Sequence, residues 1–318
     1  MLLLWTCKDD KTVDWFVSKY LDGSGIRWRR FNTENFPEHA QVISTPTNCD
    51  LVFGNETLPF KEVTALWYRR PSPSIFQEIT MNDDVLFFIQ EEAERALCLV
   101  QDALKHARWM NWPENNKKSS GKIRQLQMAE KHGLRCPKTV ITNDIDIVLD
   151  LASQHNGHVI VKPLRVGSVT VENKRRVFYS TILDINQLSR MRESIKICPH
   201  IFQEPIPKLF ELRIIVVGQY CLAFKLHSQE QAATSIDWRR MATVIKHEPF
   251  SLPDAIASQC IEIVRECDLF FSAFDMIVTP EEEYVFLEHN PNGQFAWLEE
   301  KTGVPIGAAI RDILIKSK

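Results

Sequence analysis

The sequence predicts an α/β fold divided into several domains. Its 318 residues exceed what one hydrophobic core usually supports, and 44% hydrophobic with 25% charged residues is a globular composition. Short runs rich in β-branched and aromatic residues alternate with longer stretches of helical periodicity. This alternation favours partly parallel sheets flanked by helices, with α+β character where strands follow each other as hairpins.

Composition and charge exclude several classes of protein. A formal net charge of −3 disfavours a protein whose main ligand is nucleic acid. The 8 cysteines are scattered without a C-x-x-C pair, which is typical of reduced thiols in a cytoplasmic protein. The opening residues lack the features of a signal peptide, and no apolar run is long enough to span a membrane. We therefore expect a cytoplasmic protein without nucleic-acid or membrane partners.

The first expected domain covers residues 1–113 and has an α/β pattern. It opens with LLLWT as a strand, and the next helix places Val13, Phe16 and Tyr20 on one face. The stretch 108–122, rich in Pro, Asn and Ser, is expected to be a linker. The remaining expected elements are strands in 26–32, 49–60 and 65–70 and a long amphipathic helix over 83–107.

Two further domains are expected over 114–198 and 199–318. The central one begins with a helix that ends at Gly133, and 167–181 reads as a hairpin. Its other elements are strands in 137–144 and 158–164 and helices over 146–157 and 185–195. The last domain is expected to contain a strand at 200–206, hairpins over 211–228 and 271–291, a helix over 253–268 and a final helix.

Acidic and amide side chains end the last hairpin. Asp275 interrupts an apolar strand, and Glu288 and Asn290 are two residues apart on the next strand, so they share one face. The turn around Pro280 brings Asp275 and Glu288 to the same end of adjacent strands. Oxygen ligands of this kind suit Mg²⁺ bound with nucleotide phosphates. The alternative is a solvated strand end with an Asx turn.

Two lysines occupy places suited to phosphate. Lys162 ends the apolar strand HVIVK, and Lys122 begins a helix, where backbone N–H groups also favour anions. The segment 165–170 (RVGSVT) suits a turn that covers phosphates. The alternative for each lysine is a solvated surface position.

Charged residues also follow other predicted strands. The proline-bracketed segment QEPIP leaves backbone groups for an adenine edge, with Glu204 near its amino group and Glu211 near ribose hydroxyls. Arg213 shares a face with Glu211 and suits a substrate carboxylate or a transferred phosphoryl group, unless it forms a strand ion pair with Glu211. Arg69 and Arg70 follow a strand of the first domain, where ligands usually bind in α/β sheets; a surface pair is the alternative.

The order of these residues resembles the ATP-grasp ligases, from Lys122 and Lys162 to Glu288 and Asn290. The resemblance implies a fold of three domains with ATP between the central and C-terminal domains. It also implies activation of a carboxylate as an acyl phosphate. The segments YRRP, QEPIPKLFELR, DWR and LEHNPNGQFAWLEE further resemble the graspetide synthetases, the microviridin-type macrocyclases of ribosomally made precursor peptides.

The graspetide resemblance implies ω-ester bonds from Glu or Asp to Thr or Ser, with ω-amide bonds to Lys or a glutamate-adding ligase as alternatives. A kinase and a peptide-binding module are the rivals from other classes. Phe295 stands where that family often has tryptophan. The family's cofactors are ATP and Mg²⁺, its partner is the leader and core of a precursor peptide, and a homodimer is common.

The same resemblance assigns the site residues. A hydroxyl is a poor nucleophile and needs a general base, for which Asp237 and His227 are the candidates. The alternatives are that Asp237 forms an ion pair with Arg239 and that His227 is an ordinary strand residue. Helix 184–195, with Arg192 and Glu193, and the hairpin 171–181 are expected to dock the leader. The implied positions are Lys122, Lys162, Ser168, Gln203, Glu204, Ile206, Glu211 and Lys225 for ATP; Asp275, Glu288 and Asn290 for Mg²⁺; Arg213, Asp237, Arg239 and His227 for catalysis; and Arg69, Arg70, Arg192 and Glu193 for substrate.

Overall fold

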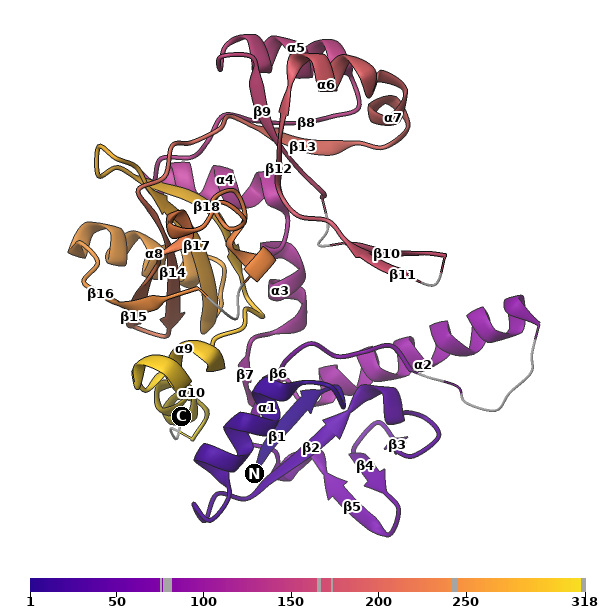
Figure 1. The fold of residues 1–318 in the computed structure, drawn as a ribbon. Coiled ribbons are helices and arrows are strands. Elements are labelled where there is room, and N and C mark those ends of the chain that lie inside the picture. The colour runs from indigo at the N-terminus through magenta and orange to yellow at the C-terminus, as the bar shows by residue number, and fades with distance from the viewer. Residues whose placement is uncertain (75, 77–81, 165–166, 173, 242–244, 316–318) are drawn as a thin grey trace.

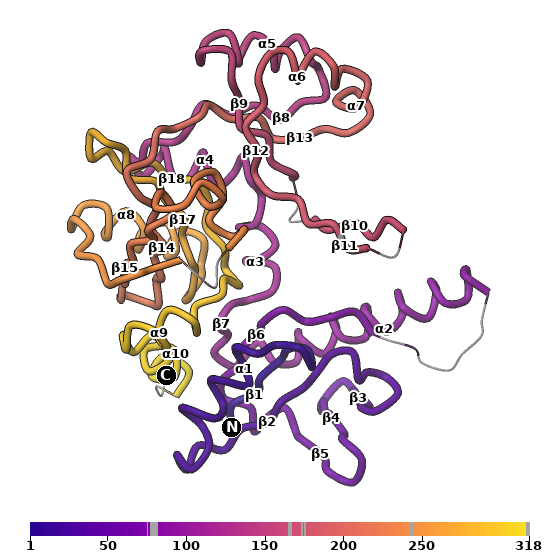
Figure 2. The backbone as a smooth tube through the Cα atoms, in the orientation of Figure 1, coloured from indigo at the N-terminus to yellow at the C-terminus, as the bar shows by residue number. Residues whose placement is uncertain are grey.

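The computed structural model describes residues 1–74, 76, 82–164, 167–172, 174–241 and 245–315. Figure 1 shows an N-terminal region, a central region at the opposite end of the molecule, and a C-terminal region between them. The backbone trace in Figure 2 shows that the last helices return to the N-terminal region. No helix among the described residues is long and apolar enough to cross a membrane.

The N-terminal region contains a parallel sheet of order β2-β1-β6-β7. Alternate residues of β1 serve opposite faces: Leu2 and Leu4 pack toward α1, whereas Leu3 and Trp5 pack toward α2. The elements are β1 (Leu2–Thr6), α1 (Lys11–Phe16), η1 (Val17–Leu21), β2 (Trp28–Asn32), η2 (Thr33–Asn35), β6 (Ala65–Tyr68), α2 (Asp83–Ala103) and β7 (Arg108–Met110), with a small sheet of β3 (Gln41–Ser44), β4 (Cys49–Phe53) and β5 (Glu56–Pro59) and the turn η3 (Phe60–Glu62).

The predicted linker 108–122 is wrong. Its first residues form β7, which joins the N-terminal sheet, and Pro113 begins the helix α3 (Pro113–Ser119). Proline is favoured in the first turn of a helix, so here it marks a helix start. Between them, the Asn111 side chain donates to the carbonyl oxygens of Phe271 (2.9 Å) and Pro291 (3.2 Å). The segment is therefore fixed to the C-terminal region.

The central region is an antiparallel sheet of order β12-β9-β13-β8. Strand β13 was expected to open the last domain, but it pairs with both β8 and β9, so a boundary at residue 198 divides this sheet. The elements are β8 (Thr139–Thr142), α5 (Ile145–Ser153), β9 (His158–Lys162), the projecting hairpin β10 (Ser168–Val171) and β11 (Lys174–Val177), β12 (Thr181–Asp184), α6 (Ile185–Arg190), α7 (Arg192–Ile197) and β13 (His200–Gln203).

The C-terminal region is an antiparallel sheet of order β16-β15-β14-β17-β18. Helices α4 and α8 pack on one face, so α4 belongs with this sheet although it lies within the expected central domain. The elements are α4 (Lys122–Lys131), β14 (Phe210–Val217), β15 (Tyr220–Leu226), η4 (Ser228–Glu230), η5 (Trp238–Met241), β16 (His247–Phe250), α8 (Asp254–Glu266), β17 (Phe271–Val278), β18 (Tyr284–Asn290), α9 (Ala296–Thr302) and α10 (Ile306–Ile315).

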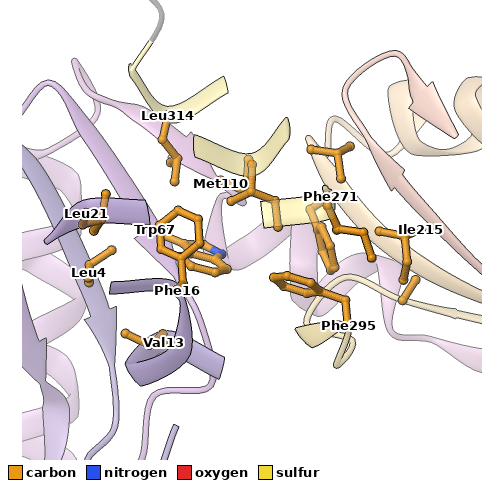
Figure 3. Close-up of a cluster of buried hydrophobic side chains, with 14 of the residues drawn as sticks. Leu4, Val13, Phe16, Leu21, Trp67, Met110, Ile215, Phe271, Phe295 and Leu314 are labelled. Atoms are coloured by element: carbon orange, nitrogen blue, oxygen red, sulfur yellow. The ribbon is translucent and has the colours of Figure 1, made fainter. Parts of the chain in front are cut away.

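A shared core joins the N-terminal and C-terminal regions. Figure 3 shows Phe16 and Trp67 of the first region next to Phe295, with Phe271 of β17 beyond. The Phe295 ring lies 5.6 Å from that of Phe271 and 6.4 Å from that of Trp67. The part of the C-terminal sheet that faces the central region lies outside this core, and Glu211, Asp275 and Glu288 line a cavity there.

Candidate active site

A cavity of about 330 Å³ lies between the central and C-terminal sheets. Apolar side chains from both sheets form its walls, among them Ile160, Ile201 and Leu287. Such a concave, mostly apolar cleft with a few converging polar groups is typical of a small-molecule site. The predicted site residues that line it are Lys122, Lys162, Gln203, Glu204, Ile206, Glu211, Asp237, Arg239, Asp275 and Glu288.

Basic side chains reach the cavity from separate elements. Lys122 begins α4, Lys162 ends β9, Lys208 precedes β14, and Arg239 lies in η5. Lys162 makes no hydrogen bond or ion pair with any residue that the structure describes, and burial lowers its pKa to about 8. A partly buried lysine without a partner requires an anion, so the cavity is suited to phosphate.

Asp275 and Glu288 form the acidic side of the cavity. They are directly opposite each other on β17 and β18, as the hairpin predicts, and both line the cavity. Burial raises the pKa of Asp275. The guanidinium of Arg213 opposes this shift, and the negative charge of Glu288 adds to it. For Glu288, burial opposes ionisation, but Lys122 in contact with it and Lys162 nearby hold its pKa at about 2. Glu288 is therefore a carboxylate at neutral pH.

Asn290 follows on the same face but is exposed and does not line the cavity. Its Oδ1 accepts a hydrogen bond from the Asn292 N–H at 2.8 Å, which is the Asx turn considered as the alternative. An amide oxygen has a second lone pair, so the turn leaves one acceptor position. The described residues hold no group of three His, Cys, Asp or Glu side chains placed for a metal ion. The role of Asn290 as a ligand stays a prediction.

The proline-bracketed segment forms the edge of the cavity beyond β13. The Glu204 carboxylate accepts from the Lys138 N–H at 3.1 Å and lies 3.6 Å from Nδ1 of His155, so the protein itself already engages it. The Ile206 N–H has no hydrogen-bond partner among the described residues, and Gln203 is held by Thr139 at 2.8 Å. The open backbone around Ile206 suits an adenine edge better than the Glu204 side chain.

Glu211 and Lys208 lie together on the floor of the cavity. Lys208 pairs with Glu211 and also donates to the carbonyl oxygen of Ile236 at 2.8 Å. Burial raises the pKa of Glu211 to about 7, although the positive charge of Lys208 beside it lowers the pKa. Glu211 thus lines the cavity as an acid that titrates near neutrality, and its contact with a ribose stays a prediction.

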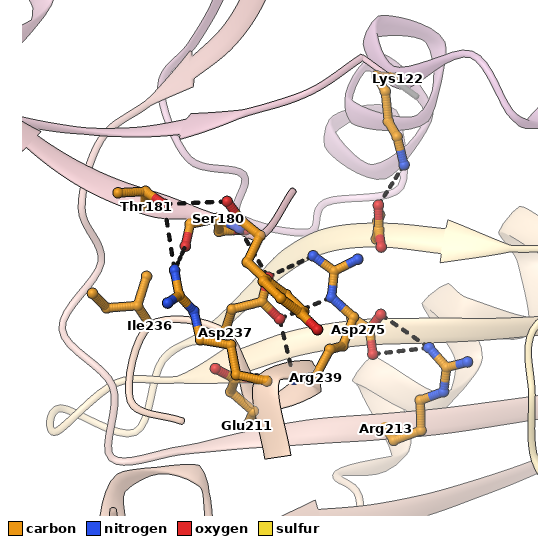
Figure 4. Close-up of polar contacts among 12 residues, drawn as sticks. Lys122, Ser180, Thr181, Glu211, Arg213, Ile236, Asp237, Arg239 and Asp275 are labelled. Carbon is orange, nitrogen blue, oxygen red and sulfur yellow. Dashed lines mark hydrogen bonds and ion pairs between the residues drawn. The ribbon is translucent and has the colours of Figure 1, made fainter. Parts of the chain in front are cut away.

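Asp237 holds Arg239 in place, as Figure 4 shows. Its carboxylate accepts from Nε and Nη2 of Arg239 at 2.8 and 2.6 Å and from the Ser180 N–H at 2.9 Å. Burial would raise the pKa of Asp237, but the hydrogen bonds from Arg239 hold it at about 2. Such a weak base is poorly suited to be the general base. The geometry favours the ion pair that was the alternative.

Arg213 does not reach into the cavity. It faces Asp275 across the β14–β17 pair, and its Nη1 donates to both carboxylate oxygens at 2.9 Å. Its Nη2 donates to the Gln294 carbonyl oxygen at 3.2 Å. Arg213 therefore forms an ion pair with the acidic side of the site, and its contact with a substrate carboxylate stays a prediction.

Three further predicted residues lie outside the cavity lining. Lys225 is opposite Leu212, on the sheet face that α4 and α8 cover, and its Nζ lies 4.6 Å from the Phe210 ring centroid. His227 lies between Glu230 and Glu248, at 2.9 and 3.0 Å. Ser168 lies on the projecting hairpin, and the preceding residues 165–166 of the predicted turn are outside the described residues.

The arginines of the first region are also apart from the cavity. Arg69 is 1% exposed and lies 3.0 Å from the buried Asp10, and its Nη2 donates to Gln294 at 2.8 Å. Arg70 is exposed with a φ of 47°. Arg69 is thus a buried link between regions, not the surface pair considered as the alternative.

The predicted leader-docking residues lie on the far side of the central sheet. Arg192 and Glu193 begin α7 and are exposed, and Arg192 pairs with Asp146 at 2.9 Å. The hairpin β10–β11 projects from the other end of this region (Figure 1). Their role in binding a leader stays a prediction.

Sequence reasoning missed Lys208, Ser180 and Trp238 among the cavity residues. The sequence carried a signal for Lys208, because this residue directly follows Pro207 and lies three residues before Glu211. Ser180 contributes a backbone N–H, and a backbone donor leaves no mark on the residue type. The Trp238 ring lies 5.6 Å from that of Trp297 of α9 in a tilted arrangement, a contact between distant segments.

Comparisons with known proteins agree with this architecture. The family described as the MvdD pre-ATP grasp domain matches residues 1–117. A search of curated protein sequences finds no significant match.

Several solved structures are similar over the full length. Macrocyclase MdnC of Microcystis aeruginosa MRC, bound with precursor peptide MdnA, has a TM-score of 0.88 and 28% identity over 99% of both chains. A RiPP-associated ATP-grasp ligase of Chryseobacterium gregarium, in complex with ADP and a leader and core peptide, has a TM-score of 0.90 and 26% identity over 98% of this chain and 96% of that one. Macrocyclase MdnB of the same Microcystis strain has a TM-score of 0.81 and 27% identity over 99% of both chains.

Proposed function

This chain belongs to the ATP-grasp ligases of the peptide-macrocyclase (graspetide synthetase) family, and we propose that it closes rings in a ribosomally made precursor peptide by forming ω-esters. The acids would be Glu or Asp side chains of the core, and the nucleophiles Thr or Ser hydroxyls. The observation that carries the proposal is the cavity in which Lys122, Lys162 and Arg239 face Asp275 and Glu288.

The residues of the cavity fit ATP with Mg²⁺. Lys162 has no hydrogen bond or ion pair among the described residues. Burial is the main cause of its lowered pKa, and Lys208, Lys122 and Arg239 lower it further, so a phosphate beside it would stabilise the ammonium. Asp275 and Glu288, with Asn290 beyond them, are the oxygen donors that would hold Mg²⁺. When bound, Mg²⁺ would neutralise the negative charge of the phosphates during phosphoryl transfer.

The chain's own residues would orient the reacting groups. Lys162 and Lys122 would hold the phosphates, while the open Ile206 N–H would bind an adenine edge. Arg239, held by Asp237, would attract the substrate carboxylate at the mouth of the cavity. This assigns to Arg239 the role that was expected of Arg213.

Two bond exchanges complete the proposed reaction. A carboxylate oxygen of the peptide forms a bond to the γ-phosphorus, and the bond to ADP breaks. The hydroxyl oxygen then bonds to the acyl carbon, its proton leaves to a base, and phosphate departs. Because acyl phosphates hydrolyse, exclusion of water from the cavity matters. The proposal assigns no base, because Asp237 is engaged by Arg239 and His227 lies outside the cavity lining.

The test is mass spectrometry of a candidate precursor peptide with Thr, Ser, Glu and Asp in its core, after incubation with the protein, ATP and Mg²⁺. We expect losses of one water mass per ring with equal release of ADP, and reversal by mild alkali. Resistance to alkali would indicate amides. A gain of phosphate would indicate a kinase and would contradict the proposal.

A further inference from the structure

We propose that Gln125 is a positioning residue that fixes the strand end carrying Glu288 and Asn290. The inference rests on the proposed function, because it matters only if these side chains hold a metal ion with the nucleotide. Gln125 is 3% exposed and lies on α4, three residues after Lys122. It does not line the cavity, so its influence would pass through the backbone of β18.

The Gln125 amide binds the backbone of His289 in both directions. Its Nε2 donates to the His289 carbonyl oxygen at 2.7 Å, and its Oε1 accepts from the His289 N–H at 3.4 Å. The same Nε2 donates to the Ser119 carbonyl oxygen at 2.7 Å. Gln125 thus pairs with β18 as a neighbouring strand would, and it ties the start of α4 to residue 289.

Strand β18 needs such a partner because it is the edge of its sheet. The register with β17 also shifts between Asp275 and Met276, so that Glu288 and Phe286 pair with consecutive residues and Leu287 is extra. A bulge interrupts the ladder and lets the bulged strand bend. The irregularity lies directly before Glu288, and Gln125 binds directly after it.

The other contacts of His289 are consistent with a fixed position. Its side chain is 2% exposed, its Nδ1 lies 2.9 Å from the Ser272 hydroxyl, and its ring stacks on Phe274 at 5.2 Å. Because side chains alternate along a strand, a buried His289 directs Glu288 to the cavity face. Gln125 holds the backbone at His289, so it fixes the backbone position from which the Glu288 side chain extends.

Removal of the amide would leave buried backbone groups without partners. The carbonyl oxygens of His289 and Ser119 would each lose a donor, and the His289 N–H would lose its acceptor. The strand end could then bend at the bulge toward new partners. We expect the carboxylates to be misplaced relative to each other, while Lys162, which lies on β9 of the central sheet, stays where it is.

The experiment compares Gln125→Met with Gln127→Met. Both remove an amide from α4, but Gln127 is exposed and has no hydrogen bond among the described residues. Binding of Mn²⁺ in the presence of ADP is followed by electron paramagnetic resonance, and ADP binding in EDTA by calorimetry. For Gln125→Met we expect a Mn²⁺ affinity about 10-fold to 100-fold weaker, as for other residues that orient metal ligands. Metal-free ADP binding should be unchanged.

A second variant tests the direction of the amide, and metal-free ADP binding shows that both variants fold. Gln125→Glu keeps the acceptor for the His289 N–H, but its buried carboxylate faces the carbonyl oxygens of Ser119 and His289, so we expect a Mn²⁺ affinity at least as weak as that of Gln125→Met. Wild-type Mn²⁺ affinity in both Gln125 variants, or equal losses of metal-free ADP binding and Mn²⁺ binding, would overturn the inference. If the unmodified protein binds neither ADP nor Mn²⁺, the proposed function itself fails.

Discussion

The cavity and the link at Arg69 both place charged side chains at strand ends, yet they differ in what the charges face. Arg69 and Asp10 are 1% exposed each, and the arginine donates to Gly293 and Gln294 as well. In the cavity, Lys162 has no partner within the described part of the chain, and Arg239 keeps 37% of its side chain exposed. A buried charge whose partners are all within the protein stabilises the fold, whereas a charge that faces the cavity is available to a ligand.

The largest expected effect is on the stability of the Arg69 link. Arg69→Met leaves Asp10 buried without its ion pair, which should lower the free energy of unfolding by about 3–5 kcal/mol. Chemical denaturation measures the loss. Arg70→Met is the matched control, because Arg70 is exposed, and it should change stability by less than about 0.5 kcal/mol. Equal stability of both variants would remove the distinction between the two regions.

The second prediction concerns Lys162. Lys162→Met should lower the cyclisation rate by about 10²–10³-fold, since a preorganised charge at the transferred phosphate is lost. It should leave the melting temperature equal or higher, because the side chain is desolvated without a partner. Lys118→Met, on the exposed side of α3, is the control. An active Lys162→Met variant would contradict the phosphate role.

The third prediction separates positioning from base catalysis at Asp237. Asp237→Asn weakens the acceptor that holds Arg239, so the rate should fall about 10-fold to 100-fold. With a pKa of about 2, Asp237 should be ionised across the working range, and the loss should be the same at every pH from 6 to about 8. A wild-type rate that falls with acid, and a variant that lacks this dependence, would restore Asp237 as the base.

The smallest effect is a pH dependence from Lys162. Its pKa of about 8 in the folded chain lies below the usual 10.5. Above pH 8 the ammonium is lost, so KM for ATP should rise by up to about tenfold per pH unit. The unfolded chain binds this proton more tightly, so the same group should make the fold more stable as pH rises from 8 to 10.5. A flat KM up to pH 10 would contradict the assignment.

The sequence predicted charges at strand ends, but it did not predict the faces on which they lie. Lys162 was predicted to face an anion because a lysine at the end of an apolar strand is rarely buried without a partner. Lys225 was predicted to bind ATP, but it lies outside the cavity lining, and only the pairing of β14 with β15 shows that it is opposite Leu212. The Asp237–Arg239 pair was foreseen as an alternative, whereas only the Arg213–Asp275 register shows that Arg213 is already engaged.

The domain pattern shows the same limit. Long periodic segments such as α2 and α8 were predicted, while β7 has only 3 residues, too few for a visible period. Strand β13 was predicted as a strand but assigned to the wrong sheet, because a short apolar run does not reveal its neighbours. Local pattern indicates an element, and long-range pairing decides where it lies.

The most direct test of the central claim follows the oxygen atoms of the activated carboxylate. A precursor peptide carrying ¹⁸O in its Glu and Asp side chains is incubated with this protein, ATP and Mg²⁺, and the released phosphate is examined by mass spectrometry. Activation as an acyl phosphate predicts one ¹⁸O atom in the phosphate for each ring closed. Ring closure with unlabelled phosphate would contradict the account.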